Sequence, residues 1–203
     1  MLFDELDWLI EASQHAHVPE ERATEFRSAD GGSTEREYLN LLYALVCATK
    51  ARTILETGTF NGWGTLALAR AALRTDGHVY TLDTNPFGNG SIFSAEEARL
   101  VSFIRTDSRP FLRSTALHFD FAFLDSDLPA RVEELTVLTE RGLLRPAALI
   151  CIHDTSRHRP KYRDDGSSHF LKEFPSRFSG KLMVLDLPLS RGLYVCQVPW
   201  RSE

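Results

Sequence analysis

The chain has 203 residues, of which 43% are hydrophobic and 25% are charged, and its formal net charge is −5. This length and composition can bury one full core, which excludes a disordered chain and favours one compact globular unit. The acidic balance argues against a nucleic-acid-binding protein, because contacts to phosphate usually need a basic face.

The cysteines, the first residues and the apolar runs indicate in which cellular compartment the protein is expected. Cys47, Cys151 and Cys196 each lie in an apolar run without C-x-x-C spacing, so we expect buried thiols rather than disulfides or zinc ligands. The first residues carry acids and lack the basic segment of a signal peptide. No apolar run approaches the roughly 20 residues needed to cross a bilayer. We therefore expect a cytoplasmic protein that has no membrane partner.

The N-terminal residues 1–33 are expected to form a helix followed by a lid. Residues 2–17 place apolar side chains on one helical face, and residues 18–32 are polar and end in a glycine pair, which indicates a loop. The apolar face of the helix can cover the core, the active site or a second subunit, so a homodimer is one of the expected arrangements.

Residues 34–203 are expected to form one α/β domain. Thr34 and Glu37 fit a capping box before a helix that ends near Ala48. Strand-like and helix-like runs then alternate, which is typical of a doubly wound, mostly parallel sheet buried on both faces. The last two strand-like runs are joined by a short loop and are expected to form an antiparallel hairpin. The predicted strands are residues 53–57, 78–82, 101–105, 120–124, 148–152, 181–185 and 192–198, and the predicted helices after residue 53 are residues 64–73, 95–99, 130–141 and 168–174.

The turn after the first predicted strand, ILETGTFNGWG at residues 54–64, has the features of a nucleotide-cofactor site. Gly58 and Gly62 permit a tight turn and close approach of a ligand to the backbone. Their spacing is not the G-x-G-x-x-G of dinucleotide-binding turns. The carboxylate of Glu56 would oppose a phosphate and suit a cationic ligand such as S-adenosylmethionine (SAM), although it can instead anchor the turn through backbone N–H groups. The predicted cofactor-binding residues of this turn are Glu56, Thr57, Gly58, Phe60, Asn61 and Gly62.

Acidic residues also end the second and third predicted strands. Asp83, followed by Thr84, lies where a carboxylate can accept both ribose hydroxyls of a nucleotide, although an aspartate there can also form the turn. Asp107 and Ser108 lie where the edge of an adenine ring can bind, and a helix N-cap is the alternative.

The ends of the fourth and fifth predicted strands carry the candidate catalytic residues, Asp125, His153 and Asp154. Because parallel strands end at the same edge of a sheet, these side chains are expected to converge. They can form an oxygen-rich Mg²⁺ or Mn²⁺ site, or His153 can act as a general base without a metal. A third interpretation is that Asp154 caps the following loop.

These motifs, in this order and spacing, resemble those of the class I SAM-dependent methyltransferases. ETGTFNGWGTLALA resembles the first motif of the family and VYTLD the second, while FDFAFLDSD and LLRPAALICIHDT are similar to the fourth- and fifth-strand motifs and RGLYV to the closing strand. The resemblance spans roughly residues 38–198 and is nearest to the small-molecule branch that includes catechol and macrolide-sugar O-methyltransferases. It implies a Rossmann-like sheet, SAM bound at the residues named above together with Asp125, and a small-molecule hydroxyl as methyl acceptor.

Two positions depart from the family pattern. Ala147-Ala148 stands where the family usually has Gly-Gly, and His153-Asp154 stands where catechol-type enzymes have Asp-Asn. The second departure leaves open whether a divalent metal assists the reaction. Two other functions also stay open at this point: an NAD-type oxidoreductase and a non-catalytic SAM-binding protein.

Overall fold

The computed structural model describes residues 28–30, 32–156, 174, 177–178, 180–188 and 190–198. The predicted helix at residues 2–17 lies outside the described residues. So do most of the predicted lid at 18–32, most of the predicted helix at 168–174, and the loop that precedes that helix. Within the described part of the chain, none of the helices is long and apolar enough to span a membrane.

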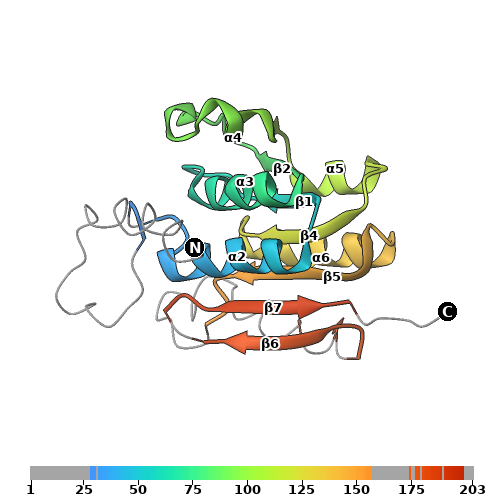
Figure 1. The fold of residues 1–203 in the computed structure, drawn as a ribbon. Helices are drawn as coiled ribbons and strands as arrows, with labels where there is room; N and C mark the ends of the chain where they lie inside the picture. The colour runs from blue at the N-terminus through green and yellow to red at the C-terminus, as the bar shows by residue number, and fades with distance from the viewer. Residues whose placement is uncertain are drawn as a thin grey trace.

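A seven-stranded sheet with the strand order β3-β2-β1-β4-β5-β7-β6 forms the centre of the domain (Figure 1). The first five strands are parallel, while β7 runs antiparallel between β5 and β6. The expected doubly wound sheet with a C-terminal antiparallel hairpin is therefore confirmed. The strands are β1 (Thr53–Thr57), β2 (His78–Asp83), β3 (Val101–Arg105), β4 (Phe119–Leu124), β5 (Leu144–His153), β6 (Met183–Leu187) and β7 (Leu193–Gln197).

Helices cover both faces of this sheet, which explains the continuous apolar strands. On one face α2 (Arg36–Thr49) and α3 (Trp63–Thr75) pack side by side, and on the other face α5 (Ser108–Ser114) packs beside α6 (Leu128–Glu140) (Figure 1). Neighbouring residues of one strand point to opposite faces. Ile54 of β1 therefore enters the core under α2 and α3, whereas Leu55 enters the core under α5 and α6.

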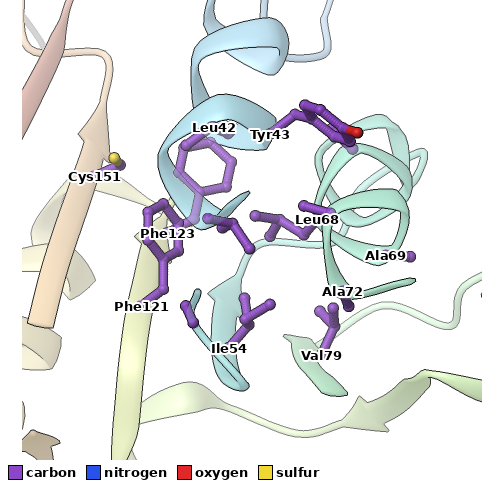
Figure 2. Packing of buried hydrophobic residues seen from close by; sticks show 14 of the residues in the cluster. Leu42, Tyr43, Ile54, Leu68, Ala69, Ala72, Val79, Phe121, Phe123 and Cys151 are labelled. Atoms are coloured by element: carbon purple, nitrogen blue, oxygen red, sulfur yellow. The ribbon is translucent and has the colours of Figure 1, made fainter. Parts of the chain in front are cut away.

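Figure 2 shows the first of these two cores. Leu42 of α2 and Leu68 of α3 meet Ile54, Phe121 and Phe123 from the two central strands, and all five side chains are fully buried. Burial of a side chain of this size stabilises the fold by about 2 kcal/mol. This packing fixes β1 beside β4, and so it fixes the strand ends from which the functional residues extend.

The start of α2 differs from the prediction. Glu35, not Thr34, is the N-cap residue, and it makes no side-chain capping hydrogen bond. The Thr34 hydroxyl instead donates to Asp125 Oδ2 over 2.8 Å. The predicted capping box is therefore wrong, because a partner 91 residues away competes for the threonine side chain.

Several other elements also differ from the prediction, most of them by one or two residues at an end. The helix α5 and a short 3₁₀ turn, η3 (Gly90–Ile92), were not predicted, whereas α4 (Ala95–Arg99) has the predicted bounds. β6 begins two residues later than predicted, and β5 begins four residues earlier. Near the start of β5 the register with β4 shifts, and Ala147 there has a φ of 64°. This left-handed conformation favours glycine, the residue type that the family resemblance implies at this position.

Candidate functional site

A cavity of about 380 Å³ lies at the carboxyl ends of the parallel strands, where open α/β sheets bind their ligands. This volume is within the range of small-molecule sites. Its walls come from the segments that follow β1, β2, β3, β4 and β5, and from Gly32, Ser33 and Thr34. The predicted site residues that line it are Glu56, Gly58, Phe60, Asp83, Thr84, Asp107, Ser108, Asp125 and Asp154.

Four predicted residues, Thr57, Asn61, Gly62 and His153, are not part of the cavity lining. The Thr57 hydroxyl donates to Glu134 beneath the cavity, and the Asn61 amide donates to Asp30 over 2.7 Å. Gly62 is the N-cap of α3 with a φ of 83°. Thr57, Asn61 and Gly62 therefore shape the turn and hold the segment around Asp30 against it.

Gly58 is the position at which the turn requires glycine. Its φ is +88°, and a Cβ built there would lie 2.4 Å from the carbonyl oxygen of Asp125. Its N–H donates to the carbonyl oxygen of Leu82 over 2.8 Å. The chain can thus pass between the ends of β2 and β4 only without a side chain at this position.

Glu56 forms part of the cavity floor, although its side chain is almost fully buried. Its Oε2 accepts hydrogen bonds from the hydroxyls of Thr65 and Thr81, the second over 2.6 Å. Its Oε1 has no hydrogen-bond partner among the described residues. Burial raises the pKa of Glu56 to about 8, since it outweighs the two hydroxyl donors. A buried carboxylate with a free oxygen beside a cavity is a site that favours a cation.

Asp83 and Asp107 form the turn and the N-cap that the sequence left open as alternatives to ligand binding, and both also line the cavity. Asp83 forms the turn, because its carboxylate accepts the N–H of Asn85 over 2.8 Å and that of Phe60 over 3.0 Å. Asp107 is the N-cap of α5 and accepts the N–H of Arg109, and its hydrogen bonds from Arg109 lower its pKa to about 2. Both carboxylates nevertheless face the cavity, and each retains lone pairs that can accept from a ligand.

A second buried acid, Glu134 of α6, supports the cavity from below and was not predicted. Its Oε1 accepts from the hydroxyls of Ser108 and Ser126, and its Oε2 accepts from Thr57 over 3.0 Å. Burial raises the pKa of this carboxyl. Glu134 therefore ties together the ends of three strands.

His153 lies between two carboxylates. Its Nε2 is 2.6 Å from Glu35 Oε2 and its Nδ1 is 2.9 Å from Asp125 Oδ1, while the ring is fully buried. Burial alone would lower the pKa of His153, but the two carboxylates outweigh it and raise the pKa to about 9. Because both nitrogens are engaged, the ring presents no free nitrogen to the cavity. This geometry argues against the predicted general base.

Two arginines that sequence reasoning missed complete this cluster. Arg131 of α6 donates from one nitrogen to Asp125 Oδ1 over 3.0 Å and to Asp154 Oδ2 over 3.3 Å. Arg191, from the turn before β7, donates to both carboxylate oxygens of Asp154, over 2.6 and 3.0 Å. The pKa of Asp154 is lowered well below its usual range, because His153 and the two guanidinium groups outweigh its burial.

The stability of the fold is expected to depend on the charge of His153. Its pKa of about 9 lies above the ordinary value of 6.5, so its contribution is fully present below about pH 6.5 and is lost as the pH rises through 9. The difference between these two pKa values corresponds to about 3 kcal/mol of the free energy of unfolding. We expect the melting temperature of the protein to fall between these pH values, and to fall less in His153→Gln. Equal declines in both proteins would contradict a charged His153. Glu56 titrates in the same direction, so the comparison between the two proteins isolates the histidine.

The strand order, the cavity at the first strand ends and the acid near the end of β1 are the features expected of a class I methyltransferase. Residues 55–155 match a protein family described as a methyltransferase domain. A protein of Mycobacterium tuberculosis described as a probable O-methyltransferase is 30% identical over 169 residues, which cover 73% of this chain and 71% of that protein.

Two solved structures of O-methyltransferases share the fold of this chain. An O-methyltransferase of Streptomyces achromogenes involved in tomaymycin synthesis, solved with SAM, is 23% identical with a TM-score of 0.67, over 96% of this chain and 89% of that one. An O-methyltransferase of Bacillus cereus, solved with S-adenosylhomocysteine, is 22% identical with a TM-score of 0.65, over 96% and 90% of the two chains. The chain belongs to the SAM-dependent O-methyltransferase family. This membership removes the NAD-type oxidoreductase as an alternative.

Proposed function

We propose that this protein transfers a methyl group from SAM to a hydroxyl group of a small molecule, and that SAM binds in the cavity at the ends of β1, β2 and β3. The observation that carries the proposal is Glu56, whose unpartnered buried oxygen adjoins the cavity. SAM carries an ammonium and a sulfonium group, so this carboxylate would attract it. A phosphate at the same place would be repelled.

The other cavity residues fit the remaining parts of SAM. The Asp83 carboxylate can accept from the ribose hydroxyls with the lone pairs that the backbone N–H groups leave. The segment at Asp107 and Ser108 is the next strand end along the sheet, where the adenine ring would lie. We therefore propose the same cofactor-binding residues as the sequence predicted, except that Thr57, Asn61 and Gly62 shape the turn and do not line the cavity.

Methyl transfer is an in-line displacement at sulfur, so placement of the acceptor oxygen supplies much of the acceleration. The acceptor hydroxyl must also lose a proton. Asp125 and Asp154 adjoin the cavity. Burial would raise their pKa values, but the neighbouring His153 and arginine side chains outweigh burial and lower them. Both carboxylates are therefore weak bases. We therefore expect acceptors whose hydroxyl ionises readily, such as phenols, in preference to aliphatic alcohols.

A non-catalytic SAM-binding protein is not favoured by the structure. The departure from the family at Ala147 lies near the start of β5, whereas the cavity adjoins the end of that strand. A cytoplasmic location, a homodimer and the absence of a nucleic-acid partner stay predictions.

The test is methyl transfer from isotopically labelled SAM to a panel of phenols and aliphatic alcohols. We expect labelled product from at least one phenol, and loss of that activity in Asp83→Ala. The exposed residue Glu96, replaced by Gln, provides the control. Bound SAM without transfer to any hydroxyl would contradict the proposed reaction while leaving the cofactor site intact.

A further inference from the structure

The acidic cluster at the ends of β4 and β5 is the candidate metal site of this fold. Asp125, His153 and Asp154 each offer one ligand atom, and these atoms lie within 4.8 Å of one another. Oxygen-rich sites of this kind suit Mg²⁺ or Mn²⁺ in composition. The question is whether these atoms are available to a cation.

We infer that the guanidinium of Arg131 takes the position between Asp125 and Asp154 that a divalent cation would need, so that this cluster is held together by internal ion pairs instead of a metal ion. One nitrogen of Arg131 contacts an oxygen of each carboxylate, over 3.0 and 3.3 Å. A metal ligated by both carboxylates, at about 2.1 Å from each oxygen, would collide with that nitrogen.

Arg131 is fixed in this position by its other contacts. Its Nε donates to the carbonyl oxygen of Ser126 over 2.6 Å, and its NH1 donates to the carbonyl oxygen of His153. The side chain is 3% exposed. To make room for a metal, it would have to leave the buried carbonyl oxygen of His153 and the partly buried one of Ser126 without this donor, which is unfavourable.

The remaining ligand atoms are also engaged. Asp125 Oδ2 accepts from the Thr34 hydroxyl, and Arg191 spans both oxygens of Asp154. Both ring nitrogens of His153 are engaged by a carboxylate oxygen, Nδ1 by Asp125 over 2.9 Å and Nε2 by Glu35 over 2.6 Å, so neither is free to bind a metal.

The two guanidinium groups also supply positive charge to the cluster without a metal. Arg131 forms ion pairs with Asp125 and Asp154, and Arg191 forms a second one with Asp154. A bound Mg²⁺ or Mn²⁺ would place two further positive charges beside these guanidinium groups in a largely buried site. Arg131 is therefore a positioning residue that keeps the two carboxylates at the edge of the cavity.

The test uses Mn²⁺ and the full chain, and it reads binding rather than methyl transfer, so its outcome is separate from that of the proposed function. Electron paramagnetic resonance measures the free Mn²⁺ that remains as the ion is titrated to about 1 mM, the range of weak protein sites. For the unaltered protein we expect the free signal to match that of buffer, and the melting temperature to be the same with Mn²⁺ as with a chelator. Saturable binding of one Mn²⁺ that Asp125→Asn abolishes would overturn the inference.

Removal of the guanidinium tests its position directly. In Arg131→Met the two carboxylates lose their shared partner, and we expect Mn²⁺ to bind at least about tenfold more tightly than to the unaltered protein. Arg105→Met is the control, because Arg105 is an exposed β3 residue that donates to the carbonyl oxygen of Thr84. A folded Arg131→Met protein that binds Mn²⁺ no better than this control would contradict the inference. If Arg131→Met does not fold, the titration of the unaltered protein decides.

Discussion

Replacement of Gly58 by alanine is expected to destabilise the protein by about 3 kcal/mol and to abolish SAM binding. The added methyl group would lie 2.4 Å from the carbonyl oxygen of Asp125, and it would meet backbone atoms that cannot rotate away. The φ of +88° adds strain for any residue with a Cβ. Because the turn lies between the ends of β2 and β4, the strain would widen the cofactor cavity as well as weaken the fold.

Chemical denaturation of Gly58→Ala and of Gly88→Ala, the matched control, measures this effect. A Cβ at Gly88 meets nothing within 4 Å, so that variant is expected to be as stable as the unaltered protein and to bind SAM normally. Equal stability of the two variants would contradict the geometry of the turn.

Replacement of Glu56 by glutamine is expected to weaken SAM binding about 30-fold near pH 8.5, which corresponds to about 2 kcal/mol of binding free energy. Near pH 6 the replacement is expected to have little effect. Burial raises the pKa of Glu56 to about 8 in the free protein, so near pH 6 the carboxyl is protonated and resembles the glutamine amide. As the pH rises, the carboxyl ionises and attracts the cationic ligand. The affinity of the unaltered protein, relative to that of Glu56→Gln, therefore increases with pH.

Calorimetric titrations of both proteins with SAM at several pH values give this ratio. The ratio is used because the ammonium of SAM also titrates, at about pH 8, which changes the charge of the ligand in both titrations. Glu96→Gln removes an exposed carboxylate and is expected to behave as the unaltered protein does. A ratio that stays constant across the pH range would exclude Glu56 as the group that attracts the cofactor.

Local patterns predicted most of the sheet. Residues 53–57 and 101–105 were predicted with the observed bounds. In β1 most side chains are buried on both faces, and in β3 buried or half-buried residues alternate with exposed ones, so each strand leaves a pattern in the sequence. The bounds of β6 were less well predicted. It is one of the two edge strands, and unlike β3 it exposes four consecutive residues, including Met183, Val184 and Leu185, so burial imposes no pattern there.

Only some members of the charged cluster around His153 could be predicted from the sequence. Strand ends point to Asp125, His153 and Asp154, but their partners are far away in sequence: Glu35 is 118 residues from His153, and Arg191 is 37 residues from Asp154. Arg131 lies in a segment whose helical pattern was predicted, where an arginine is ordinarily a solvated side chain. Nothing local distinguishes a buried guanidinium from an exposed one. For this reason the sequence left a metal and a histidine base open. The contacts of Arg131 argue against the metal, and those of Glu35 and Asp125 with the His153 ring argue against the base.

The central claim is that the cavity beside Glu56 binds SAM, and calorimetric titration of the purified chain with SAM tests it most directly. We predict saturable binding at one site, with a dissociation constant in the range of about 1 μM to 1 mM that is typical of enzyme substrates, and a rise in melting temperature at saturation. The absence of both heat and a thermal shift at saturating SAM would contradict the claim.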